Sequence, residues 1–273
     1  MSRGDNGLGV ATWGQTGAVL AIVCAVFGLA IGSFLNVVVW RVPRGESVVR
    51  PPSACPGCHK AIRTRDNVPV LGWLLLRGRC RDCGEPISLR YPLVEAGTGA
   101  LFAMMAVRFG LDAALPAFLY LAAVGLALAL IDLDTKRLPD VLTLPAYPVG
   151  GVLLVVAALV DHEPQRLLHV LSGGAALFAL YYVLWFFGGM GYGDVKLAGV
   201  LGGYLGYLGL SQWIVGTFGG FFIGGIISLI LLATGKAGRK TRVPHGPFML
   251  VGTLVGIVAG GLLADAYLSV SGV

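Results

Sequence analysis

Long apolar runs, separated by short polar segments, make up most of this chain. A helix that crosses a bilayer needs about 20 mostly apolar residues, and eight stretches approach or reach that length. The second stretch contains Glu95 and the sixth is short and rich in glycine, so these two are the weakest. The predicted spans are residues 16–40, 92–109, 113–132, 141–160, 167–187, 195–210, 212–234 and 247–268. The pattern predicts an all-α integral membrane protein with about eight transmembrane helices.

One sizeable polar region interrupts this pattern. It divides the chain into an N-terminal tail with the first span (1–40), a polar loop (41–91) and a seven-span core (92–273). Composition agrees with a lipid environment, because 56% of the residues are hydrophobic and only 12% are charged. Soluble domains usually carry about 25% charged residues.

Glycines recur at intervals of four within several of the predicted spans. Gly28 and Gly32 form one such pair, and further runs occur at 216–224 and 252–260. Small residues at this spacing share one helix face and let two membrane helices approach closely. A chain with 42 glycines also produces such pairs by chance, so specific packing is one of two open interpretations.

Basic residues are distributed unevenly about the spans. With eight spans, ten Lys or Arg residues in the polar loop and seven in later segments fall on one side, which leaves three on the other. The positive-inside rule assigns the richer side to the cytoplasm and both termini to the opposite face. We therefore expect a plasma (inner) membrane protein whose loop touches anionic lipid. The net charge of +6 could suggest nucleic-acid binding. The one-sided placement of the basic residues instead indicates that they orient the protein in the membrane.

The polar loop contains two C-x-x-C pairs, Cys55 with Cys58 and Cys80 with Cys83. Four thiolates with this spacing suit a tetrahedral structural zinc site. A cytoplasmic location argues against disulfides. Because His59 follows Cys58, the first pair also fits the motif for covalent haem attachment, although that leaves the second pair unexplained. The fifth cysteine, Cys24, is interpreted as a packing residue.

Two aspartates stand at the ends of predicted spans. Asp132 closes the third span and Asp194 opens the sixth, so both are expected at the cytoplasmic border. Ionisable residues at such positions are costly and tend to be functional. Two carboxylates that share a proton can hydrolyse a peptide bond, because one activates water while the other donates a proton. The dipole at a helix start favours the ionised form of Asp194.

Simpler explanations exist for each acidic residue. Asp194 could cap a helix, and Asp132 and Asp134 could be border charges near basic residues. Asp140 follows Pro139 and is expected to cap the fourth span. Gly191 and Gly193 beside Asp194 reduce side-chain bulk and permit unusual backbone angles, which would let an extended substrate approach.

The order of several motifs resembles the type IV prepilin peptidases, membrane aspartyl peptidases that are also called leader peptidase/N-methyltransferases. The resemblance covers most of the chain and includes both cysteine pairs. Its other motifs are Gly32-Ser33-Phe34-Leu35-Asn36-Val37-Val38, Trp40-Arg41-Val42-Pro43, Leu76-Arg77-Gly78-Arg79-Cys80, Ile87-Ser88-Leu89-Arg90-Tyr91-Pro92-Leu93-Val94-Glu95, the segment from Asp132 to Asp140, and Gly191-Tyr192-Gly193-Asp194-Val195-Lys196-Leu197.

The resemblance implies a site and a reaction. Asp194 matches the G-x-G-D aspartate of the family, within an active-site loop that includes Gly191, Gly193 and Lys196. Shorter relatives keep one aspartate seven residues before the proline of the other motif, which here selects Asp132 over Asp134.

The implied substrates are prepilins or pseudopilins of type IV pili and protein secretion, whose basic leaders are cut on the cytoplasmic side. Long relatives also methylate the new N-terminus with S-adenosylmethionine, and Glu95 and Gly97 match the suspected methyl-transfer region. The chain shows no glycine fingerprint for that cofactor, and Glu95 could instead serve packing or ion pairing. His245 departs from the family, whose members often carry an aromatic residue there.

Two other functions fit parts of the sequence. Intramembrane aspartates could bind protons or cations in a transporter or channel, which would place them deeper in the bilayer. A non-enzymatic assembly factor could use the cysteine loop for docking, in which case Asp194 would be dispensable.

Overall fold

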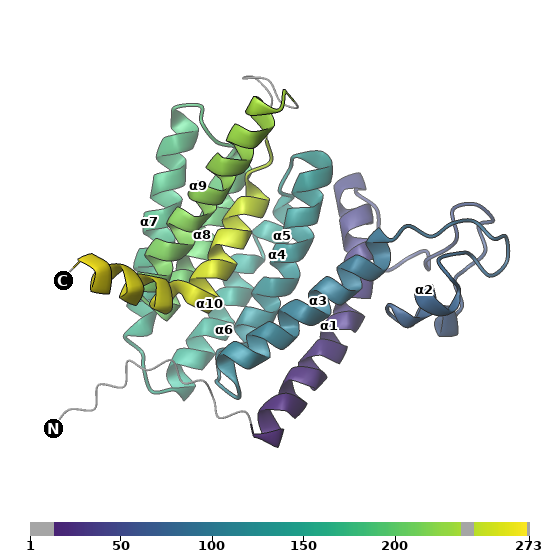
Figure 1. Cartoon of the computed structure of the whole chain (residues 1–273), viewed down its shortest axis with the longest axis horizontal. Helices are drawn as coiled ribbons and strands as arrows, with labels where there is room; N and C mark the ends of the chain where they lie inside the picture. Colours follow the sequence, from purple (N-terminus) through teal and green to yellow (C-terminus); the bar gives the residue numbers. More distant parts are fainter. Residues whose placement is uncertain (1–13, 236–242, 272–273) are drawn as a thin grey trace.

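The computed structural model describes residues 14–235 and 243–271, and in these ranges it is helical and has no β-strand (Figure 1). Residues 1–13 of the N-terminal tail and the basic residues of 236–242 lie outside the described part. The long helices are α1 (Gln15–Arg41), α3 (Arg90–Phe109), α4 (Leu115–Thr135), α6 (Ala146–Val160), α7 (Arg166–Phe186), α8 (Tyr192–Leu208), α9 (Leu210–Ala233) and α10 (Gly246–Ser271). Each predicted span coincides with one of these helices.

The fourth predicted span begins earlier than α6, with the single turn α5 (Asp140–Thr143). Leu144 and Pro145 separate α5 from α6, because a proline cannot donate the backbone hydrogen bond that a continuous helix needs. One more short helix, α2 (Leu71–Leu75), lies in the polar loop.

Six helical regions of the described chain are long and apolar enough to cross a membrane: α1, α4, α5 with α6, α7, α9 and α10. These spans make the chain a multi-pass membrane protein. The two weakest predicted spans are not among them, since α3 carries Arg90, Glu95 and Arg108 and α8 has only 17 residues. The predicted number of eight spans is therefore not confirmed. Most residues of α8 are buried, so neighbouring helices rather than lipid surround this short helix.

Three antiparallel pairs pack most closely, α1 with α3, α7 with α8, and α9 with α10, and Figure 1 shows the pairs side by side. Helix α4 contacts α1, α3, α6 and α10. Its residues Phe118, Leu128 and Ile131 are almost completely buried. The C-terminal end of α4 and the N-terminal end of α8 are thereby held inside the bundle.

Glycines form the closest helix contacts, which supports specific packing over chance. A Cβ atom on Gly28 of α1 would lie 2.8 Å from the Thr98 carbonyl oxygen of α3, and one on Gly256 of α10 would lie 2.8 Å from the Gly216 Cα of α9. Separations below 3.0 Å are not tolerated by real side chains, so these pairs require glycine. The α7–α8 pair uses Gly173 and Gly206 in the same way, which the spacing argument did not identify.

Candidate active site and metal centre

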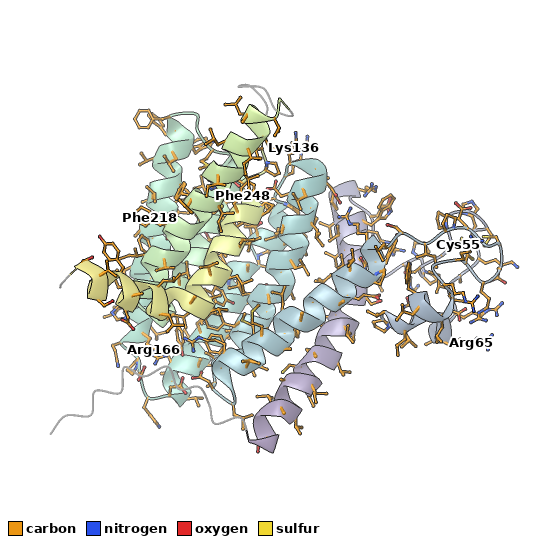
Figure 2. All side chains as sticks on the ribbon, in the orientation of Figure 1. Cys55, Arg65, Lys136, Arg166, Phe218 and Phe248 are labelled. Carbon is orange, nitrogen blue, oxygen red and sulfur yellow. The ribbon has the colours of Figure 1, made fainter. Side chains whose placement is uncertain are left out.

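A cleft of about 660 Å³ opens at one end of the bundle. Three segments that are distant in sequence line it: Val42 and Pro43 after α1, the end of α4 with the turn to Pro139, and the start of α8. Asp132, Asp194, Gly191, Gly193 and Lys196 all line this cleft. Lys136, another lining residue, is labelled at the upper end of the bundle in Figure 2, opposite Arg166 at the lower end.

Asp132 lies in the last turn of α4 and is only 5% exposed. Its Oδ2 accepts a hydrogen bond of 3.1 Å from the backbone N–H of Gly246, the first residue of α10. A Cβ atom on Gly246 would lie 2.9 Å from that oxygen. Glycine therefore lets the start of α10 come close enough to hold a buried carboxylate at a helix N-terminus, where the dipole favours negative charge.

Asp194 is the third residue of α8 and is partly buried. Its Oδ2 accepts a hydrogen bond of 3.0 Å from the N–H of Gly191, so the expected capping role exists alongside any catalytic one. The expectation of unusual backbone angles is wrong, since Gly191 has the ordinary extended angles φ −81° and ψ 150°. Gly193 instead provides space, because a Cβ atom there would lie 3.0 Å from the Cβ of Leu138.

The other acidic residues of the two motifs are engaged elsewhere. Both oxygens of Asp134 accept hydrogen bonds from Arg90 of α3, at 2.9 and 2.6 Å. Asp140 forms an ion pair with Lys196 and no side-chain cap, so its predicted capping role is wrong. Asp132 and Asp194 thus face the cleft while Asp134 is turned to α3.

Lys196 joins two parts of the cleft wall. Besides its ion pair with Asp140, its Nζ lies 5.2 Å from the ring centre of Tyr192. Its carbonyl oxygen accepts a hydrogen bond of 2.7 Å from the hydroxyl of Tyr147. Only 15% of the side chain is exposed, so Lys196 positions the start of α8 against α5 and α6.

The two carboxylates line the same cleft. Such a pair favours states in which one proton is shared, so that an acid and a base occupy the same site. Both residues lie within four residues of a helix end. Neither aspartate therefore lies at the middle of a helix.

The four loop cysteines gather into one cluster, with their sulfur atoms all within 4.8 Å of one another. Cys55 and Cys83 lie 3.7 Å apart, and Cys58 and Cys80 lie 4.0 Å apart. Zinc–sulfur bonds of about 2.3 Å in a tetrahedron require sulfur separations of about 3.8 Å. The backbone N–H groups of Cys83 and Asp82 lower the pKa of Cys80 to about 7, which favours the thiolate. The cluster therefore fits a metal ion such as zinc.

The two halves of the cluster have the same backbone design. In each, the N–H of the first cysteine bonds to a carbonyl five residues later, and the residue after the second cysteine has a positive φ. These residues are His59, at φ 58°, and Gly84, at φ 76°. Because both pairs serve one cluster, the haem alternative has no support here, and the exposed His59 is a turn residue rather than a ligand.

Glu95 and Gly97 lie on α3, away from the cleft. Glu95 is 8% exposed, and its Oε2 accepts a hydrogen bond of 2.7 Å from the N–H of Val70 in the polar loop. A Cβ atom on Gly97 would meet nothing within 4 Å. The Glu95 carboxylate is thus engaged with the loop backbone, and neither residue lines the cleft that holds Asp132 and Asp194.

Sequence reasoning did not assign Gly246 to the site. Its N–H acts on a carboxylate that is 114 positions away in the chain, so no local pattern connects the two. The available signal was the Gly246-Pro247 pair at the start of an apolar run, because proline near the first turn marks a helix N-terminus.

Known proteins resemble the chain in both halves. Residues 26–109 match the family model of the bacterial peptidase A24 N-terminal domain, and residues 118–229 match that of the type IV leader peptidase family. The prepilin leader peptidase/N-methyltransferase of Myxococcus xanthus is 40% identical over 84% of this chain and 68% of its own length.

Two further relatives support the same family. The type 4 prepilin-like proteins leader peptide-processing enzyme of Escherichia coli is 35% identical over 89% of this chain and 95% of its own length. The Klebsiella pneumoniae prepilin leader peptidase/N-methyltransferase is 41% identical over 69% of this chain and 86% of its length. No solved structure is significantly similar. On these matches and on its membrane-helical fold, the chain belongs to the type IV leader peptidase family.

Proposed function

We propose that this protein is a membrane aspartic peptidase that removes leader peptides from prepilins or pseudopilins and also methylates the new N-terminus. The observation that carries the peptidase proposal is the convergence of Asp132 and Asp194 on one cleft at a helix-bundle end. The names of the relatives support both activities.

The geometry supports a water-mediated mechanism. In the described residues, each carboxylate accepts one backbone hydrogen bond, and both bonds go to Oδ2. The Oδ1 atoms are left for the attacking water and for the substrate. The ionised aspartate removes a proton from water as the water attacks the scissile carbonyl, and the protonated aspartate donates its proton to the carbonyl oxygen. When the C–N bond breaks, the proton taken from water passes to the leaving amine, and the diol returns a proton to the other aspartate. Gly191, Gly193 and Lys196 shape the wall beside this pair.

The peptidase proposal is tested with a purified prepilin whose cleavage is followed by mass spectrometry. We expect Asp132→Asn and Asp194→Asn to lower the cleavage rate by at least about 10³-fold, since each removes one member of an acid–base pair. Asp134→Asn is the matched control, because that carboxylate pairs with Arg90 and its loss should cost far less. Full cleavage by both Asp132→Asn and Asp194→Asn would rule the dyad out.

For methylation, S-adenosylmethionine is the proposed methyl donor, and it supplies an electrophilic methyl group for the new N-terminal amine. The residues proposed from the sequence, Glu95 and Gly97, are supported only by the family match, so no chemical step is assigned to them. The mass of the N-terminal peptide of a co-expressed prepilin reports the outcome. An added methyl group supports the second activity, and a cleaved but unmodified terminus argues against it.

We also propose that zinc occupies the four-cysteine site as a structural ion. We further propose that the protein lies in the inner membrane, with the cleft and the cysteine loop on its cytoplasmic side. The sulfur geometry supports the first statement, and the charge distribution supports the second. Metal analysis tests the zinc site: we expect one zinc ion per chain, and its loss in a Cys58→Ser variant. No retained zinc in the unmodified protein would contradict this assignment.

A further inference from the structure

The short helix α2 has one face that no described part of the protein covers. Leu71, Leu74 and Leu75 are 57%, 55% and 79% exposed. Their spacing of three and four residues places them on a single side of the helix. Exposed leucines clustered on a polar loop are unusual, because water makes such a surface unfavourable.

The opposite face of α2 is built into the loop. Gly72 is buried, and a Cβ atom there would overlap the carbonyl oxygen of Asp66. The Trp73 Nε1–H donates a hydrogen bond of 3.0 Å to the carbonyl oxygen of Ile87, and the Trp73 ring lies against Gly78. α2 therefore has two distinct faces. Its inner face packs against the loop, and its outer face is apolar and exposed.

The start of α2 is attached to a long helix of the bundle. The hydrogen bond from the Val70 N–H to the Glu95 carboxylate joins it to α3. Val70 adopts φ 60° and ψ −50°, and the Leu71 N–H bonds to the Pro69 carbonyl oxygen at 2.6 Å. This is a γ-turn of the rare, strained kind, and a β-branched residue adopts it only where the surroundings enforce it. The Glu95 carboxylate is one contact that holds this turn, through the hydrogen bond from the Val70 N–H.

This attachment sets the level of α2 relative to the membrane border. Arg90, at the start of α3, pairs with Asp134 in the last turn of α4, beside the cleft. Glu95 lies five residues further along α3, which is about 7.5 Å along the helix axis at 1.5 Å per residue. Interfacial helices bury their apolar faces about 5–10 Å into the boundary between head groups and acyl chains. Figure 1 shows α2 to the right of α1 and α3, lower in the view than the start of α3.

The positive charge that follows α2 is complementary to an anionic lipid surface. Arg77 and Arg79 follow the helix directly and are exposed. Neither arginine forms an ion pair within the described ranges, whereas Lys60, Arg63 and Arg81 of the same loop do. Anionic head groups attract the two free guanidinium groups, and the acyl chains below them accommodate the adjacent apolar face.

We infer that α2 is an interfacial anchor that docks the cysteine loop on the lipid bilayer. Leu71, Leu74 and Leu75 insert between acyl chains, Arg77 and Arg79 bind the phosphates of anionic lipid, and Glu95 holds α2 at that depth as a positioning residue. This role does not depend on the proposed peptidase chemistry. It gives Glu95 a task other than methyl transfer.

The test uses full-length protein in nanodiscs that contain equal parts of phosphatidylglycerol and phosphatidylcholine. Leu75 is replaced by the photo-crosslinking amino acid p-benzoylphenylalanine, and lipid adducts are identified by mass spectrometry. Phe222 of α9, which is 70% exposed, is the positive control, and Lys60, at the first cysteine pair, is the negative control. We expect an adduct yield at 75 similar to that at 222 and at least several-fold above that at 60. A yield at 75 no higher than at 60, or cross-links to a second protein chain instead of lipid, overturns the inference.

Two further variants test the contributions of charge and depth. Arg77→Gln with Arg79→Gln should reduce the preference of the position 75 adduct for phosphatidylglycerol by up to about fivefold for each arginine; an unchanged preference excludes the head-group contact. Glu95→Leu should speed hydrogen exchange in residues 68–76 and lower the adduct yield at 75, whereas Glu95→Gln, which keeps an acceptor oxygen, should preserve both. Equal behaviour of the two variants contradicts the positioning role.

Discussion

Gly246 shows how much of the cleft geometry depends on one missing side chain. In a Gly246→Ala variant, the new Cβ atom would lie 2.9 Å from Asp132 Oδ2 and 3.4 Å from Leu138, so α10 must withdraw and the N–H bond to the carboxylate lengthens. A hydrogen bond to a charged group contributes about 1.5–3 kcal/mol, which corresponds to a cleavage rate lower by about 10- to 150-fold. Prepilin cleavage assays measure this.

Gly151→Ala of α6 is the matched control for that variant, because a Cβ atom there meets nothing within 4 Å. Its cleavage rate should equal that of the unmodified protein. If Gly246→Ala cleaved equally fast, the amide of Gly246 would have no part in holding Asp132.

His245 occupies the position next to Gly246 and is surrounded by aromatic rings. Its ring centre lies 5.6 Å from that of Phe221 and 6.3 Å from that of Phe248, and its Nε2 shares a hydrogen bond of 3.1 Å with the Tyr181 hydroxyl. Burial lowers the pKa of His245 to about 4, so the imidazole is neutral near pH 7. The residue substitutes for an aromatic contact, as expected from the sequence, and adds one polar bond.

This pKa shift predicts acid sensitivity. The unfolded chain binds a proton at His245 near pH 6.5 and the folded protein binds it only near pH 4, so stability falls as pH decreases between these values. At pH 5 the loss amounts to about 2 kcal/mol. His245→Phe should remove this component, so the fall in Tm between pH 7 and pH 5 should be smaller than in the unmodified protein. Equal falls would show that His245 does not titrate in this range.

At the scale of elements, the two cysteine turns form a natural comparison. Both need a left-handed residue after the second cysteine, and one turn has Gly84 there while the other has His59. The left-handed conformation costs a non-glycine residue about 1 kcal/mol. His59→Gly should therefore slow zinc loss to a chelator by about fivefold, and Gly84→Ala should speed it by a similar factor. Changes of the same sign in both variants would contradict the equivalence of the turns.

The helices and turns also differ in how far the sequence could predict them. The positions of the eight long helices follow from apolar runs, and Gly28 and Gly32 could be assigned to a packing face. Their partner Thr98 could not, because nothing in the sequence states that α3 returns along α1. α2 and the γ-turn at Val70 were missed for a related reason: five residues carry too little periodicity, and the turn's hydrogen bond goes to Glu95, 25 positions away.

At the scale of the whole molecule, the residues of the candidate site are easier to predict from the sequence than the contacts that hold them in place. Asp132 and Asp194 were singled out because charge at the ends of apolar runs is rare. The resemblance to shorter family members, which keep an aspartate seven residues before the proline, selected Asp132 over Asp134. The contacts that hold them, from Gly246 to Asp132 and from Lys196 to Asp140, connect residues 114 and 56 positions apart. Such pairs depend on how the helices assemble, and single-sequence patterns do not contain that information.

The number of membrane crossings is the remaining property of the whole molecule, and the two weak spans decide it. If α3 and α8 cross the membrane, then Gly110, Glu163 and Gly209 lie on one side, and Asp66, Arg137 and Gly189 lie on the other. Figure 2 places Lys136 and Arg166 at opposite ends of the bundle, in agreement with this alternation. Alkaline phosphatase is active only outside the cytoplasm, so fusions after the first three residues should be active and fusions after the last three inactive. GFP fusions at the same six positions should give the reverse pattern. An inactive phosphatase after Gly110 or Gly209 would mean that α3 or α8 does not cross, and the basic residues would then no longer gather on one side.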